Sequence, residues 1–244
     1  MTRRRLLIGN WKMHGDGGAL ADVRAIAARA EAAPAVEVAL CVPATLVHRA
    51  ASAAPGLQIG GQDCHHAPRG AHTGEVAAAM LREAGARLVI LGHSERRARG
   101  EDDASVAAKV RAAQAADLRV VLCVGEAITA REEGRALADV AAQLRRSLDG
   151  VETAGIIVAY EPIWAIGSGR TPTPREVAEM AELIVAELGD VPVLYGGSVT
   201  PDNGASLIAN TPVDGFLVGG ASLSPIPFGE LIAVLSQKGS AAAA

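Results

Sequence analysis

The sequence predicts an α/β fold, a single (β/α)8 barrel of eight parallel strands with helices on the outside. Three observations support this prediction. Short apolar runs recur along the chain, alanine-rich amphipathic segments separate them, and the 244 residues divide into eight units of about thirty residues, the usual size of a strand–helix repeat. An open parallel sheet would share the first two features, but eight uninterrupted units favour the closed barrel.

The apolar runs are typical of strands that are buried on both faces. Each run is short, rich in leucine or β-branched residues, and does not alternate with polar residues. The predicted strands are 6–9, 36–42, 57–60, 88–91, 120–124, 156–160, 193–195 and 215–218.

The segments between these strands carry charges on one side and alanine or leucine on the other, as amphipathic helices do. Thr173 before Pro174, and Thr200 before Pro201, are typical helix starts, with a capping residue followed by proline. The predicted helices include 18–33, 76–84, 103–116, 129–148 and 174–188.

One catalytic domain over residues 1–239 is expected, because the composition does not change along the chain and there is no proline- or serine-rich linker. The last five residues, 240–244, are expected to be a disordered tail. Half of the residues are hydrophobic and only 2% are aromatic, so aliphatic side chains must fill the core.

Charge and cysteine content exclude several classes of function. A net charge of −4 argues against a nucleic-acid-binding protein, and the apolar stretch near the start is too short for a signal peptide or a membrane span. The three cysteines, Cys41, Cys64 and Cys123, form no framework of pairs. Reduced thiols and a cytoplasmic location are therefore expected, with no membrane partner.

Chemically active residues follow the predicted strands, and in a (β/α)8 barrel the carboxyl ends of the strands form the catalytic face. These residues are Asn10 and Lys12 after the first strand, His93 after the fourth, Glu161 after the sixth, Ser198 after the seventh, and Gly219 and Gly220 after the eighth. Each residue alone could have a structural role, but their common position on one face predicts a shared site.

The residue types indicate proton transfer next to a carbonyl group. Glu161 at an apolar strand end can act as a base on carbon, while His93 and Lys12 can stabilise an oxyanion. Glycine turns before helices can bind a phosphate through backbone N–H groups. The sequence therefore predicts a small phosphorylated substrate, and this chemistry requires no metal and no cofactor.

The segment directly after Glu161 is expected to close over the site. Pro162 and Trp164 would stiffen its start, and Gly167 and Gly169 would allow its backbone to approach the phosphate. Closure would exclude water and protect a reactive enediolate.

The motifs GNWKM, GAHTGEVAAAML, LGHSERR, CVGE, AYEPIWAIGSG, YGGSV and DGFLVGGASL occur in this order between Gly9 and Leu223. Together they resemble the triosephosphate isomerase family, whose fold is the TIM barrel. The resemblance implies that Glu161 is the base and His93 a neutral electrophile. It also implies that Lys12 stabilises negative charge and Asn10 orients the substrate.

The same resemblance implies further roles around these residues. Glu95 would hold Lys12 in place. The backbone N–H groups of Gly167, Ser198, Gly219 and Gly220 would bind the phosphate of a triose. Members of the family are homodimers, so the loop 67–74 would insert beside residues 12–16 of a second copy, with Thr73 reaching towards the partner's site.

Two positions depart from the family pattern. His14 stands where asparagine is common, and Pro172 stands where the family more often has alanine. In the family, a tyrosine that matches Tyr195 accepts a hydrogen bond from the backbone N–H at position 172, and proline has no N–H. A weaker closed state of the segment after Glu161 is therefore expected.

Other functions remain open at this point. A sister isomerase acting on a four-carbon phosphosugar would keep the same residues and differ only in the depth of the pocket. A non-catalytic barrel is disfavoured, because the base, the lysine and the histidine are all present. Cys64, His65, His66 and His72 are poorly spaced for one metal ion, and no nucleotide-binding motif occurs.

Overall fold

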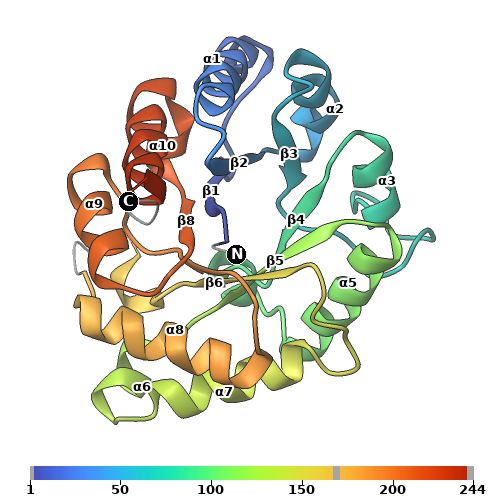
Figure 1. Ribbon diagram of the computed structural model, residues 1–244. Helices are drawn as coiled ribbons and strands as arrows, with labels where there is room; N and C mark the ends of the chain where they lie inside the picture. The colour runs from blue at the N-terminus through green and yellow to red at the C-terminus, as the bar shows by residue number, and fades with distance from the viewer. Residues whose placement is uncertain (1–2, 167–170, 241–244) are drawn as a thin grey trace.

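The computed structural model describes residues 3–166 and 171–240, and its strands form one closed parallel barrel (Figure 1). The strands pair in sequence order, and β8 closes the ring on β1. They are β1 (Arg5–Asn10), β2 (Val36–Cys41), β3 (Gln58–Gly61), β4 (Leu88–Leu91), β5 (Arg119–Val124), β6 (Ile156–Tyr160), β7 (Val193–Tyr195) and β8 (Gly215–Val218). The predicted (β/α)8 fold is confirmed.

The strands are buried on both faces, as their apolar runs predicted. One set of side chains fills the inside of the barrel: Leu6, Ile8, Ala39, Cys41, Leu88, Ile90, Val121, Cys123, Ile157, Ala159, Leu194 and Leu217. The alternate side chains, such as Leu7 and Leu40, pack outward in a second and larger cluster with the helices. The ring closes tightly at Gly215, where a Cβ atom would lie only 1.7 Å from the carbonyl oxygen of Leu6.

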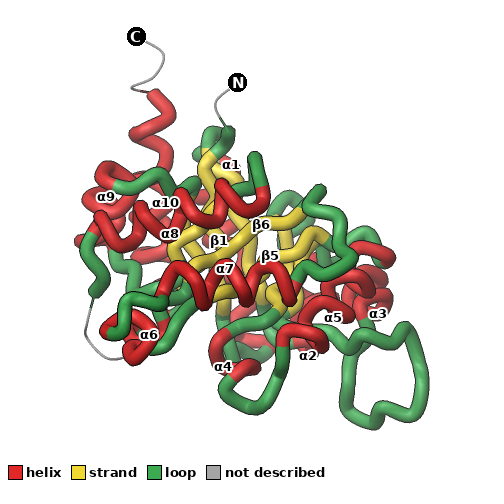
Figure 2. Tube along the Cα trace, turned by 90° about the horizontal axis from the view of Figure 1, so that it is seen from below, coloured by secondary structure: helices red, strands yellow, loops and turns green. Residues whose placement is uncertain are grey.

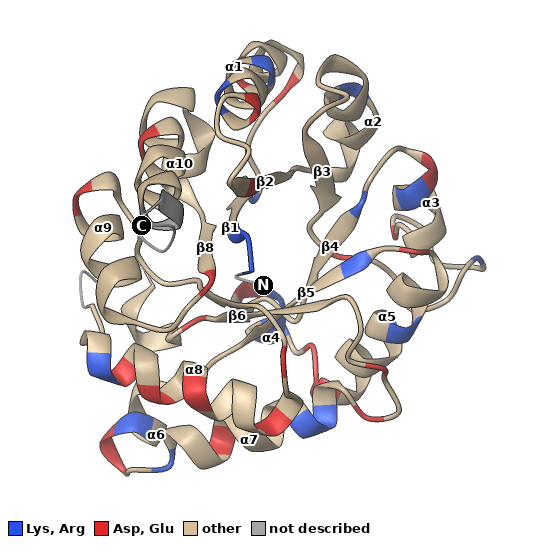
Figure 3. Ribbon diagram, viewed as in Figure 1, with Lys and Arg blue, Asp and Glu red and all other residues tan. Residues whose placement is uncertain are grey.

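Helices surround the barrel on its outside, as Figures 1 and 2 show. They are α1 (Leu20–Glu31), α2 (Ala44–Ala53), α3 (Ala78–Glu83), α4 (Ser94–Arg97), α5 (Asp103–Ala115), α6 (Ile128–Glu132), α7 (Ala136–Ser147), α8 (Pro174–Leu188), α9 (Pro201–Asn210) and α10 (Pro225–Ser240). The described part of the chain also contains the short 3-10 helices η1 (Gly17–Ala19), η2 (Ile163–Ala165) and η3 (Gly220–Leu223). Acidic and basic residues are interspersed over the outer helices in the view of Figure 3.

The helix starts at Thr173 and Thr200 form as predicted, and each carries a capping box that satisfies backbone N–H groups of the first turn. The single helix predicted over 129–148 is wrong. It is divided into α6 and α7 because Gly134 adopts a φ of 71°, which ends a helix at low cost for glycine.

The carboxyl end of the chain differs in part from its prediction. Ser240, which was predicted to belong to the disordered tail, is the last residue of α10. Residues 241–244 lie outside the described residues. Within the part of the chain that the structure describes, no helix is long and apolar enough to cross a membrane.

Candidate active site

A cavity of about 290 Å³ opens at the carboxyl ends of the strands. Its lining residues come from segments that are far apart in sequence: Asn10, Lys12, His93, Glu161, Ile166, Gly196, Gly197, Ser198, Val199, Thr200, Leu217, Gly219, Gly220 and Ala221. The structure therefore brings together every proposed site residue except three. Glu95 stands directly behind Lys12, Thr73 lies on a separate loop, and Gly167 falls outside the described residues.

Glu161 is placed by the end of β6 and is only 3% exposed. Its backbone N–H donates to the carbonyl oxygen of Val124 at 2.8 Å, which continues the pairing with β5. One carboxylate oxygen, Oε1, lies 3.0 Å from Nε2 of His93, and the other, Oε2, accepts the N–H of Ser94 at 3.0 Å. Both carboxylate oxygens of Glu161 are therefore hydrogen-bonded in this structure.

Gly196 after β7 permits this position of the side chain, since a Cβ atom there would lie 3.0 Å from Cγ of Glu161. Gly125 is needed on the other side, because its Cβ would lie 1.7 Å from the carbonyl oxygen of Glu161. Two glycines thus allow the close approach of the neighbouring strand ends.

His93 precedes α4 and is its N-cap residue, and its ring nitrogen Nδ1 accepts the backbone N–H of Glu95 at 3.2 Å. A nitrogen that accepts this bond carries no proton, so the neutral ring carries its proton on Nε2. That proton points to Glu161 in this structure. The neutral form implied by the family resemblance is therefore compatible with the hydrogen bonds made here.

Lys12 is held from two sides. Its backbone N–H donates to the side-chain oxygen of Asn10 at 3.0 Å, which supports a φ of 51°, a conformation unusual for a residue other than glycine. Its ammonium group lies 2.6 Å from the carboxylate of Glu95. Although burial acts in the opposite direction, this ion pair with Lys12 keeps the pKa of the Glu95 carboxyl below its ordinary value.

Three of the proposed phosphate-binding residues, Ser198, Gly219 and Gly220, line the same cavity and follow β7 and β8. Asn203 of α9 donates to the carbonyl oxygen of Ser198 at 3.0 Å and so fixes that turn. The turn at Gly219 and Gly220 is fixed by Ser222, whose hydroxyl donates to the carbonyl oxygen of Gly219 at 2.6 Å. The indole N–H of Trp11 donates to the carbonyl oxygen of Ser222 at 2.9 Å, which joins this turn to the segment after β1.

The loop between β3 and α3 projects from the barrel (Figures 1 and 2) and carries the exposed Thr73. Beside the cavity at the strand ends lies a groove of about 360 Å³, whose lining includes Lys12, Met13 and Glu95. The side chain of Met13 is exposed, with a relative accessible area of 95%. An apolar residue at this level of exposure, next to an open groove, is typical of a contact surface.

The rings of His66 and His72 both lie against the ring of His65 on the projecting loop, His66 stacked and His72 tilted. The ring centroids of His65 and His66 are 4.3 Å apart, and those of His65 and His72 are 3.9 Å apart. Within residues 3–166 and 171–240, no group of three or more His, Cys, Asp or Glu side chains has the arrangement needed to hold a metal ion.

Two features of the site were not predicted. The buried carboxylate of Glu126 accepts hydrogen bonds from Arg131, Tyr160 and Trp164, which places the start of the segment after β6. The second feature is α4, whose backbone N–H groups bind His93 and Glu161. Glu126 belongs to the motif CVGE, and α4 belongs to the motif LGHSERR. The spacing of residues in these motifs did not indicate either set of contacts.

The comparisons with known proteins agree with this geometry. The family model described as triosephosphate isomerase matches residues 5–235. Triosephosphate isomerases of Ruegeria sp. (strain TM1040) and Xanthobacter flavus are 51% and 50% identical, covering 96% and 93% of this chain and 98% and 95% of those proteins. The crystal structure of triosephosphate isomerase from Bartonella henselae aligns with a TM-score of 0.87 at 43% identity, over 95% of this chain and 99% of that one. This chain belongs to the triosephosphate isomerase family.

Proposed function

We propose that this protein interconverts dihydroxyacetone phosphate and D-glyceraldehyde 3-phosphate, with Glu161 as the base. The observation that carries the proposal is the pairing of Glu161 and His93 at 3.0 Å, in a cavity that is also lined by the turns after β7 and β8. A base, a neutral hydrogen-bond donor and backbone turns around one cavity suit a short substrate with a carbonyl at one end and a phosphate at the other.

In the first step, Glu161 removes a proton from the hydroxymethyl carbon of dihydroxyacetone phosphate. The electron pair of that C–H bond forms a carbon–carbon double bond, and the carbonyl oxygen becomes an oxyanion. The Nε2–H group of His93 and the ammonium of Lys12 stabilise that oxygen, so the charge develops where donors are already in place.

In the second step, the protonated Glu161 returns a proton to the neighbouring carbon, and the terminal oxygen becomes the aldehyde. His93 gives its Nε2 proton to one oxygen of the enediolate and recovers a proton from the other, so protons and charge balance over the cycle. Asn10 would orient the carbonyl group, and Glu95 would hold Lys12. The turns that contain Ser198, Gly219 and Gly220 would hold the phosphate, together with Gly167.

The sister activity on a four-carbon phosphosugar uses the same residues, and the size of the cavity is what separates the two. The volume of about 290 Å³ lies just below the range of roughly 300–1,000 Å³ typical of small-molecule sites, which supports the smaller, triose substrate.

The test is an assay of both substrates with the wild-type protein and the variant Glu161→Asp. We expect rapid turnover of the triose pair and a loss of about 100-fold in the variant, because shortening the side chain withdraws the base by about 1 Å. Preference for the four-carbon substrate would replace the proposal with the sister activity. Full activity of Glu161→Asp would show that Glu161 is not the base.

We also propose that the protein is a homodimer in which the projecting loop of each copy fills the groove of the other, with Thr73 near the partner's Lys12. The exposed Met13 and the open groove beside Lys12 support this arrangement. Light scattering should give twice the mass of one chain, and Thr73→Arg should shift the protein to monomers with low activity. A monomeric wild-type protein with full activity would refute the proposal.

Two further proposals concern the organisation and location of the chain. We propose one cooperative domain over residues 1–239, which calorimetry would test as a single unfolding transition. We propose a cytoplasmic location, supported by Cys41, Cys64 and Cys123, which are all free and buried. Fractionation of cells would test this location.

A further inference from the structure

The short helix α4 positions two catalytic groups at once. The backbone N–H of Ser94 donates to Glu161, and the backbone N–H of Glu95 donates to His93, at 3.0 and 3.2 Å. A small rotation of this helix would therefore misalign the proposed base and the proposed electrophile together.

This helix does not have the usual means of holding its orientation. It contains four residues, and none of them is buried. A single helical turn is unstable without tertiary support, and α4 has no apolar face to pack against the barrel. Its orientation must therefore come from polar contacts made by its side chains.

The side chain of Arg97 makes more of these contacts than any other residue of α4. Its guanidinium donates to the carbonyl oxygen of Gly92 at 2.7 Å and to Oδ1 of Asp103 at 2.5 Å. It also donates to Oγ of Ser147 at 3.1 Å and to the carbonyl oxygen of Cys123 at 3.4 Å. With a side chain only 12% exposed, Arg97 thus joins α4 to the residue that follows β4 and to β5, α5 and α7.

One of these partners, Gly92, connects Arg97 directly to His93. The carbonyl group of Gly92 belongs to the peptide bond that leads into His93, so the bond from Arg97 sets the plane of that peptide. Gly92 also has a φ of 66°, and a Cβ atom there would lie 2.8 Å from Nη2 of Arg97. The guanidinium therefore lies directly against the backbone that carries the histidine.

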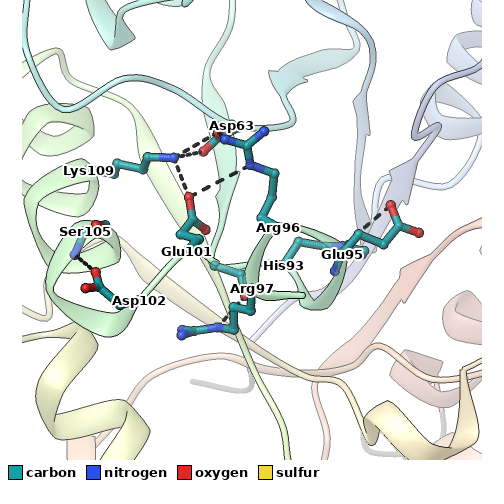
Figure 4. A network of polar contacts seen from close by, with 10 residues as sticks. Asp63, His93, Glu95, Arg96, Arg97, Glu101, Asp102, Ser105 and Lys109 are labelled. Carbon is teal, nitrogen blue, oxygen red and sulfur yellow. Dashed lines mark hydrogen bonds and ion pairs between the residues drawn. The ribbon is translucent and has the colours of Figure 1, made fainter. Parts of the chain in front are cut away.

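Asp103 makes a rigid anchor for this arginine. Its Oδ1 also accepts the hydroxyl of Ser147 at 3.0 Å, and its Oδ2 accepts Nε of Arg146 at 2.8 Å. By contrast, the neighbouring Arg96 leaves α4 in a different direction, towards Asp63 (Figure 4), and its side chain is 39% exposed.

From these contacts we propose that Arg97 is a positioning residue for catalysis. It orients α4 and the peptide before His93, so that the N–H donors of α4 meet His93 and Glu161 at the correct angles. The inference rests on the proposed isomerase function for its effect on turnover. Arg97 does not line the cavity, and its hydrogen bonds within the described part of the chain do not reach the turns after β7 and β8 that are proposed to bind phosphate. Phosphate binding should therefore not depend on Arg97.

The test compares Arg97→Lys with Arg146→Ala. Lysine keeps the charge of Arg97 but cannot reach four acceptors with one ammonium group. Arg146→Ala removes a bond to the same Asp103 without touching α4, and it serves as the matched control. Turnover is expressed per active site, counted by titration with phosphoglycolate, whose carboxylate mimics the enediolate.

We expect Arg97→Lys to lower kcat per site by about 100-fold, the scale of a 1 Å misplacement, with the inhibition constant of inorganic phosphate unchanged. Arg146→Ala should retain wild-type values. A kcat per site equal to that of the wild type, or an equal weakening of phosphate binding, would overturn the proposal. If Arg97→Lys does not fold, Asp103→Asn should show the same pattern with a loss of about 10-fold.

A second readout does not depend on turnover. The ¹⁵N spectrum of the His93 ring should show one tautomer in the wild-type protein, with the proton on Nε2. Arg97→Lys should average the two tautomers, because the N–H of Glu95 is no longer held against Nδ1. An unchanged spectrum would overturn the role of Arg97, whereas a fixed tautomer in a wild-type protein without isomerase activity would refute only the proposed function.

Discussion

The buried charge pair between Glu126 and Arg131 gives a quantitative test of how this barrel tolerates charge in its interior. The side chain of Glu126 is completely buried and that of Arg131 is 16% exposed. The carboxylate oxygen Oε1 accepts both Nε and Nη2 of Arg131, at 3.0 and 2.7 Å. The perturbation is to remove one charge at a time, with Arg131→Met and Glu126→Gln.

The two changes should have unequal costs, because the two partners are buried to different extents. Arg131→Met leaves a carboxylate in the interior without a counter-charge, which costs about 3–5 kcal/mol of the free energy of unfolding. The donors Tyr160 and Trp164 remain, at 3.1 and 2.9 Å, so we expect the lower end of that range. Glu126→Gln keeps an acceptor oxygen, and the exposed edge of Arg131 can contact water, so we expect about 2 kcal/mol.

The double variant should cost less than the sum of the single variants by about 1–3 kcal/mol, since the second change removes a charge that is already unpaired. The assay is urea unfolding at one fixed protein concentration, followed by circular dichroism and tryptophan fluorescence. Arg135→Met is the control and should leave the midpoint unchanged, because the ion pairs of Arg135 with described residues, Glu133 and Asp139, are exposed. A cost for Arg131→Met that is no larger than that of the control, or smaller than that of Glu126→Gln, would refute the reasoning.

Three further predictions follow from single groups. Burial, with a smaller effect of Asp63, raises the pKa of the Cys64 thiol to about 12. Alkylation of Cys64 at pH 8 should therefore be slow in the native protein and fast in urea. Rapid labelling of Cys64 in the native protein would contradict this. Burial opposes ionisation of Asp103, but hydrogen bonds from arginine hold the pKa of its carboxyl below the ordinary value of about 3.9. The wild-type protein should therefore be more stable than Asp103→Asn by a constant amount above that pH, and this difference should shrink as the pH falls below it. Urea midpoints that differ equally at pH 6 and pH 3 would disprove this. Pro172→Ala should tighten binding of phosphoglycolate by about 2–10-fold, the value of one hydrogen bond. Alanine supplies a backbone N–H at position 172, and the hydroxyl of Tyr195 is buried without a partner among the described residues and could accept it. An equal gain in a Tyr195→Phe background would exclude that explanation.

The convergence of Asn10, Lys12, His93 and Glu161 was predictable because each residue follows an apolar run. Parallel strands in a closed ring place all their carboxyl ends on one face, so position along the chain determines position in space. The motifs added the family, since several of them are long and occur in one order. None of this reasoning required a contact between particular atoms.

The contacts of α4 could not be predicted in the same way. Four residues are too few to show a helical period, and the bond between Ser94 and Glu161 joins positions 67 residues apart. The cluster around Glu126 has the same origin, because its donors come from three separate segments. The break at Gly134 was also missed, because the alanine-rich sequence on both sides of this glycine favours helix.

The sequence by itself determined which segments became strands, the order of the barrel and the face on which the reactive residues lie, because these depend on local apolar patterns and on chain connectivity. Only the tertiary structure decided how those residues are oriented. The direction of the His93 ring, the resting position of Glu161 and the anchoring of α4 by Arg97 all depend on hydrogen bonds between distant segments, and such bonds form only after the barrel has brought the segments together.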